Sequence, residues 1–196
     1  MPSGSGSDPN TAELLYAPWA DFLRCNHILF EEARTVSMGL GFAPMSVGAS
    51  FHNQTLWGSI GWATPAALGT SVAAPARPVV LVTGDGAHHM TAQETSQFAR
   101  LNLRTVIFVL NNSGYLMERL LCKNPAIACN DISPWRYAHL PRAPGCHGSG
   151  LRGSYVRCLR GFSPGSRAAK ISARSTGVEL SKGTFGSHQL GLPEYS

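Results

Sequence analysis

The sequence contains no apolar run long enough to cross a bilayer and no Cys-x-x-Cys pair. Its first residues, Met1 to Ser7, lack the pattern of a signal peptide. The cysteines are odd in number, which argues against a complete disulfide framework, and they are Cys25, Cys122, Cys129, Cys146 and Cys158. These absences favour reduced thiols over disulfides or a zinc site, and they predict a cytoplasmic protein without a membrane partner.

The net charge of +5 is confined to one end of the chain. Residues 147–196 carry seven Lys or Arg against two Glu, which gives +5, so residues 1–146 are neutral overall. A basic tail can bind nucleic acid, but aromatic residues do not regularly alternate with the basic ones and no nucleic-acid-binding module is recognisable. A nucleic-acid partner is therefore not expected.

Two continuous β-branched and aliphatic runs are present, Val79 to Val82 and Val106 to Leu110. Such runs are typical of parallel strands buried on both faces. Residues 91–101 between them predict a helix, and a right-handed crossover then brings both strand ends to one edge of the sheet. Other predicted strands cover 27–30 and 50–53, and other predicted helices cover 13–23, 62–72 and 115–122. The expected fold class is α/β, with a parallel sheet flanked by helices.

Polar residues follow both of these runs. Asp85 lies between Gly84 and Gly86 after the first run, and Asn112 follows the second. Because ligands of such sheets bind beyond the carboxyl ends of the strands, Asp85 and Asn112 should face one another. A carboxylate, an amide oxygen and main-chain carbonyls suit Mg²⁺, and the glycines and the amides after Asp85 allow close approach of a phosphate. The sequence thus predicts a site for a metal diphosphate.

The sequence Gly84-Asp85-Gly86, followed by 24 residues and then by Asn111-Asn112, resembles the thiamine-diphosphate signature of 2-oxo acid decarboxylases and their relatives. Three flanking segments, residues 54–63, 91–94 and 112–118, look like the pyruvate, indolepyruvate and branched-chain 2-oxo acid decarboxylase group. The resemblance covers residues 12–146. It implies the C-terminal diphosphate-binding domain of such an enzyme, with a thiamine-diphosphate-binding fold that is incomplete at its C-terminus.

The resemblance also implies roles for individual residues. The Gly58 carbonyl would bind the aminopyrimidine of the cofactor, Ile60 would hold the cofactor bent, and Glu118 would be the catalytic proton relay. Two alternatives stay open: Gly58 and Ile60 could serve a tight turn and the core, and Glu118 could be a solvated surface residue. The positions that would hold Mg²⁺ are Asp85, Asn112 and the Gly114 carbonyl, and those that would contact the cofactor besides them are Gly84, Gly86, Ala87, His88 and Tyr115.

Two details qualify this assignment. His88 and His89 follow the motif directly, but Mg²⁺ prefers oxygen ligands, so we expect their rings to pack or to meet solvent. At the end of the first strand, Ala33-Arg34 replaces the glycine-containing turn of the related enzymes. Arg34 would either crowd the diphosphate or supply an additional phosphate contact, and crowding is the favoured reading.

The related enzymes are much longer than 196 residues. Nothing in this chain corresponds to their pyrimidine-binding and middle domains, and the glutamate that activates the pyrimidine lies in the former. We therefore expect a fragment of a lyase that converts a 2-oxo acid into an aldehyde and CO₂, inactive as this chain alone. Its partners would be the 2-oxo acid and a pyrimidine-binding domain, supplied in trans or within a homo-oligomer. The alternative is a truncated, non-catalytic cofactor-binding remnant.

Both ends of the chain differ in composition from its middle. Residues 1–11 are mostly small and polar, which predicts a flexible lead-in. Residues 147–196 contain nine Gly and nine Ser and show no helical or alternating apolar period, so we expect a disordered tail without the last strand and helix of the family. The tail is either a divergent extension or the product of a change of reading frame near Cys146, and the second reading is favoured.

Overall fold

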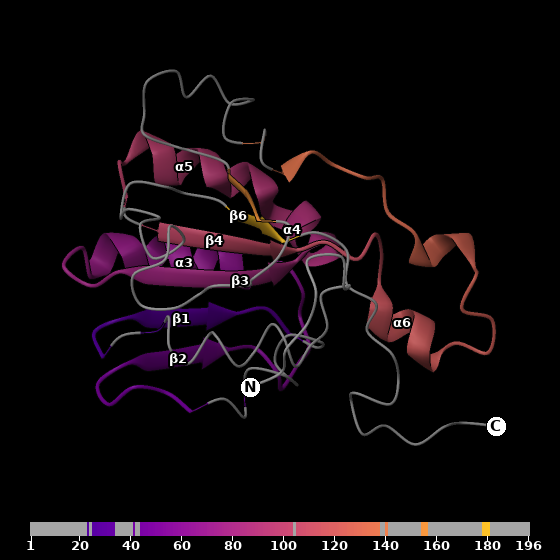
Figure 1. Ribbon diagram of the computed structural model, residues 1–196, viewed down its shortest axis with the longest axis horizontal. Coiled ribbons are helices and arrows are strands. Elements are labelled where there is room, and N and C mark those ends of the chain that lie inside the picture. Colours follow the sequence, from indigo (N-terminus) through magenta and orange to yellow (C-terminus); the bar gives the residue numbers. More distant parts are fainter. Residues whose placement is uncertain are drawn as a thin grey trace.

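The computed structural model describes residues 23, 25–33, 41, 44–103, 105–137 and 140, together with the backbone of 154–156 and 178–180. These residues form a parallel sheet (Figure 1). In spatial order its strands are β2 (Ser50–Asn53), β1 (Ile28–Glu31), β3 (Val79–Gly84), β4 (Thr105–Leu110), β6 (Val178–Leu180) and β5 (Ser154–Val156). The four strands predicted from the sequence are thereby confirmed.

The central pair β3 and β4 determines where the site lies. Its register runs from Val79 opposite Thr105 to Gly84 opposite Leu110, so both strands end at the same level. The residues that follow them, including Asp85 and Asn112, therefore emerge at one edge of the sheet. Figure 1 shows α6 (Leu116–Leu121) beyond the arrowheads of these strands.

Of the predicted helices that fall on described residues, those over 62–72 and 115–122 are confirmed, and one connection differs. Helix α3 (Ala63–Ala73) follows the predicted range closely. The helix predicted over 91–101 instead begins at Asp85, as α4 (Asp85–Thr91), and continues as η1 (Ala92–Glu94) and α5 (Thr95–Arg100). The break falls at Thr91, whose φ of −140° and ψ of 25° leave the helical region. Thr91 Oγ1 donates to the Gly61 carbonyl at 2.9 Å, which ties the end of α4 to the connection before α3.

The core lies where α3 and α5 cover one face of the sheet. Every second residue of a strand points to this face, which explains why the continuous apolar runs supply alternate residues to it. The buried cluster comprises Ile28, Phe30, Ala63, Ala67, Val79, Leu81, Phe98, Ile107, Val109 and Tyr137. Among the described helices, none is long and apolar enough to cross a membrane.

Two short strands lie after Cys146, where no strand is recognisable from the sequence. Strand β6 pairs with β4 through Phe108 opposite Val178 to Leu110 opposite Leu180, and β5 pairs with β6. Each of these strands has three residues, which is too short for an alternating pattern to be detected. The remaining tail, residues 1–11 and the predicted helix over 13–23 (except Leu23) lie outside the described residues.

Glu31 is an unusual residue for the end of a central strand. It lies between Asn53 of β2 and Val82 of β3 in the register, and its side chain is fully buried. Neither carboxyl oxygen has a hydrogen-bond partner of good geometry. Burial raises the pKa of Glu31 to about 8, and the nearby Asn53 side chain lowers this pKa in part. At neutral pH the folded chain therefore holds a protonated acid there.

We predict that Glu31 makes the fold less stable as the pH rises. Above pH 4.5 the unfolded chain ionises this carboxyl, whereas the folded chain keeps it neutral up to about pH 8. The free energy of unfolding should fall across this window, by on the order of 3 to 5 kcal/mol from this group, and level off above it. Urea unfolding of Glu31→Gln should show a markedly smaller fall, with buried Glu32 and Asp85 contributing the rest. Glu94→Gln, at a half-buried position, is the control, and equal slopes for wild type and Glu31→Gln would contradict this assignment.

Candidate functional site

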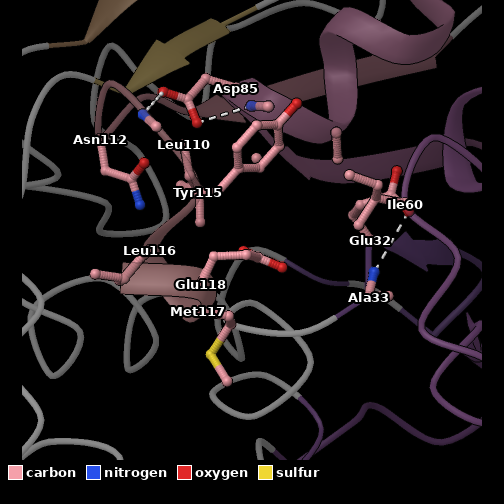
Figure 2. A pocket seen from close by; sticks show the side chains of 14 residues that line it. Glu32, Ala33, Ile60, Asp85, Leu110, Asn112, Tyr115, Leu116, Met117 and Glu118 are labelled. Carbon is pink, nitrogen blue, oxygen red and sulfur yellow. Dashed lines mark hydrogen bonds between the residues drawn. The ribbon is translucent and has the colours of Figure 1, made fainter. Parts of the chain in front are cut away.

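The candidate site is a hollow at the carboxyl edge of β1, β3 and β4 (Figure 2). Its empty space, including its open mouth, is about 580 Å³. Figure 2 shows α6 presenting Glu118 to the space between Asp85 on one side and Glu32 on the other. The lining residues are Glu32, Ala33, Ile60, Gly84, Asp85, Gly86, Ala87, Leu110, Asn112, Gly114, Tyr115, Leu116, Met117 and Glu118.

Asp85 connects the ends of the two central strands. Its Oδ1 accepts the Gly86 amide at 2.9 Å, and its Oδ2 accepts the Ser113 amide at 2.6 Å and the Gly114 amide at 3.3 Å. The side chain is almost fully buried. Burial raises the pKa of Asp85, and hydrogen bonds from the surrounding amides act in the opposite direction. The amides fix the carboxylate in place, and a nearby cation would further favour its charged form.

Asn112 and Gly114 complete a group of oxygens around Asp85. One end of the Asn112 side-chain amide lies 3.2 Å from Asp85 Oδ1 and 2.7 Å from the Gly114 carbonyl oxygen. With its nitrogen at that end, the amide donates to both oxygens. With its oxygen at that end, the amide oxygen lies at these two separations from the other oxygens, close to the roughly 3.0 Å between neighbouring ligands of an octahedral ion with bonds of about 2.1 Å. The structure thus brings together the three positions predicted for Mg²⁺, and the two separations from Asn112 are compatible with that ion.

Gly86 and Tyr115 form the wall next to this oxygen group. A β-carbon at position 86 would collide with the Tyr115 ring, so the close contact requires glycine. Ile60, Gly84 and Ala87, which the resemblance assigns to cofactor contacts, also line the hollow. Gly58 and His88 are predicted cofactor-binding residues that do not line it.

Two more carboxylates reach the hollow. Glu118 stands in the first turn of α6 and is half-buried. Glu32 follows β1 directly and is 1% exposed, and its Oε2 has no hydrogen-bond partner. Burial raises the pKa of Glu32, while hydrogen bonds from the Ala33 amide and from neighbouring groups lower it. Glu32 was not among the residues predicted for the site, although its position just after the predicted strand 27–30 was an available signal. Arg34, the predicted source of crowding, lies outside the described residues.

The two histidines after the motif do not line the hollow. Burial lowers the pKa of His88 to about 4, so its ring stays neutral. The His89 ring stacks on Trp135 at a centroid distance of 3.8 Å, and its Nε2 lies 2.8 Å from the Tyr137 hydroxyl. In the part of the chain that the structure describes, no cluster of three or more His, Cys, Asp or Glu could hold a metal ion. The packing of the rings agrees with the structural role expected for them.

Comparison with known proteins supports this picture. The family profile described as "Thiamine pyrophosphate enzyme, C-terminal TPP binding domain" matches residues 35–157, beyond the boundary predicted at 146. The alpha-keto-acid decarboxylase of Mycobacterium ulcerans (strain Agy99) is 38% identical over 144 residues, which are 74% of this chain and 25% of that protein. The alpha-keto-acid decarboxylase of Mycolicibacterium paratuberculosis (strain ATCC BAA-968 / K-10) is 39% identical over 137 residues, 70% of this chain and 24% of that protein.

Among solved structures, the thiamine diphosphate-dependent 4-hydroxybenzoylformate decarboxylase of Rhodococcus jostii RHA1 has the same fold. Its TM-score is 0.72 with 22% sequence identity, covering 95% of this chain and 35% of that chain. The chain spans about a quarter of the length of the two curated relatives. With the family profile matching most of its residues, the chain belongs to the thiamine pyrophosphate enzymes, as a C-terminal TPP-binding domain.

Proposed function

We propose that this chain binds the diphosphate end of thiamine diphosphate through one Mg²⁺ and serves a lyase that converts a 2-oxo acid into an aldehyde and CO₂. The observation that carries the proposal is the convergence of the Asp85, Asn112 and Gly114 oxygens beside a hollow. The names of the relatives support the reaction class, because both are called alpha-keto-acid decarboxylases. A cytoplasmic location remains a prediction.

The charge of the hollow explains why a cation is required. Among the residues that the structure describes, its lining includes the carboxyl groups of Glu32, Asp85 and Glu118 and no Lys, Arg or His. A diphosphate that enters such a lining without a cation meets like charge in a partly desolvated space. Mg²⁺ binds through few protein oxygens and takes its remaining ligands from phosphate and water. Metal and diphosphate should therefore bind together.

Different residues of the chain would hold the metal, support the cofactor and transfer a proton. Asp85, Asn112 and the Gly114 carbonyl would hold the metal, and the side chain of Ile60 would support the ring system of the cofactor. Bound thiamine diphosphate supplies the electron sink that allows a 2-oxo acid to lose CO₂. Glu118 faces the same hollow from α6 and would hold or deliver a proton at its carboxyl group.

A second candidate function is cofactor binding without turnover. The hollow is open, and its lining comes from the edge of this one sheet and from α6. The connection that leads to the lining residue Ile60 exposes Leu56 and Trp57, at 85% and 78% of their surfaces. We infer that a pyrimidine-binding domain, supplied in trans or by another subunit, covers this side. Without it, the diphosphate end is held but the reactive end is not enclosed.

We predict that diphosphate binding depends on the metal. Isothermal titration of the chain with inorganic diphosphate or thiamine diphosphate should give measurable heat with Mg²⁺ and none with EDTA. Asp85→Asn keeps the shape of the side chain but removes the charged ligand, and it should weaken binding by more than about tenfold, at the level of a disrupted metal site. Glu94→Gln is the control and should bind normally. Equal affinity with and without Mg²⁺ would show that the oxygen group is not a metal site.

We also predict that the chain alone releases no CO₂ from pyruvate, indolepyruvate or branched 2-oxo acids. Supplying a pyrimidine-binding domain of a related decarboxylase should restore turnover, and Glu118→Gln should reduce kcat strongly while leaving diphosphate affinity unchanged. If no CO₂ is released even with the supplied domain, the non-catalytic function is favoured. Turnover by the chain alone, lost in Glu118→Gln, would refute the need for a second domain.

A further inference from the structure

We propose that Arg119 is a positioning residue that sets the direction of the Gly114 carbonyl and thereby the affinity of the metal site. The inference rests on the proposed function, because it concerns the same oxygen group. Arg119 does not line the hollow; it lies behind the Ser113-Gly114 turn.

The peptide between Ser113 and Gly114 is held at both of its ends. Its carbonyl oxygen accepts from Arg119 Nη2 at 2.9 Å, and its N–H, that of Gly114, donates to Asp85 Oδ2 at 3.3 Å. In a trans peptide the C=O and N–H point in opposite directions, so these two contacts fix the plane of the peptide. Ser113 has a φ of 63°, a conformation that non-glycine residues rarely adopt without such support.

The peptide between Gly114 and Tyr115 is oriented by residues 130–131. The Tyr115 amide donates to the Asn130 carbonyl at 2.9 Å, which directs the Gly114 carbonyl the opposite way, toward the Asn112 amide 2.7 Å away. Gly114 also forms an isolated antiparallel bridge with Asp131. The metal-facing carbonyl thus depends on how firmly residues 130–131 are held against the turn.

Arg119 joins these two parts. The same Nη2 that binds the Ser113 carbonyl lies 2.6 Å from Asp131 Oδ1, so one guanidinium group connects the turn with the segment behind it. A β-carbon at position 114 would collide with this guanidinium and with the Asn130 carbonyl, so Gly114 packs directly against both. The Asp131 side chain is largely exposed, and a surface ion pair of this kind contributes little to global stability. Its main effect is therefore on the geometry of the turn.

The test compares Arg119→Met, Arg119→Lys and Arg119→Gln with wild type and with Arg100→Gln, an exposed arginine bonded to Gln97, as the control. Mn²⁺ in the presence of inorganic diphosphate is the probe, with the affinity and the number of sites per chain measured by electron paramagnetic resonance. Arg119→Met should weaken Mn²⁺ binding about tenfold to a hundredfold, as loss of an outer-shell partner does. Arg119→Lys, which can still donate to the Ser113 carbonyl, should recover part of this affinity, and Arg119→Gln should fall between them.

The number of sites separates positioning from simple unfolding. A positioning role lowers the affinity while each chain still provides one site, and the thermal midpoint of the metal-free variant stays close to that of Arg100→Gln. Unchanged affinity in Arg119→Met, with normal binding by wild type, would overturn this proposal alone. A reduced number of sites at wild-type affinity in all three variants would also overturn it. Failure of wild type to bind Mn²⁺ would overturn the metal site and this inference together.

Discussion

The buried Asp85 carboxylate is the constraint on which the site depends. It follows β3 directly, and it accepts amides from its own helix and from the turn after β4. These bonds connect two parallel strands at the edge where ligands of such sheets bind. The Asp85 carboxylate also accepts the amide of Gly86, the second residue of α4, which has no acceptor within the helix. The same group that organises the local backbone is thus the charged member of the oxygen group.

A fold that buries acids at this edge creates a need for positive charge. Glu31, Glu32 and Asp85 are all buried, and burial raises the pKa of each. Glu31 and Glu32 can become neutral by taking up a proton. Asp85 is held by amide donors, which favour its charged form, and the proposed divalent cation would balance that charge and attract a diphosphate. Binding of metal and diphosphate would then offset part of the free-energy cost of burying the Asp85 charge.

The sequence predicted the parts of this structure that produce repeated local patterns. The runs over 79–82 and 106–110 are long enough to identify buried strands, and the motif at their ends located the oxygen group. Glu32 was not identified as a lining residue, because its role depends on which face of a short connection turns toward the hollow. Arg119 was missed because its contacts join residues that no periodicity relates. The strand at 178–180 was missed because pairing with β4, rather than its own sequence, defines it.

The position of a bound cation tests the central claim most directly. Crystals of the chain grown with Mn²⁺ and inorganic diphosphate would locate the metal by its anomalous scattering. The account predicts a single strong peak about 2.2 Å from an Asp85 carboxylate oxygen, Asn112 Oδ1 and the Gly114 carbonyl oxygen, with diphosphate oxygens completing the shell. A diphosphate bound in the hollow without a peak at these three oxygens, or Mn²⁺ held instead by His88 or His89, would contradict it.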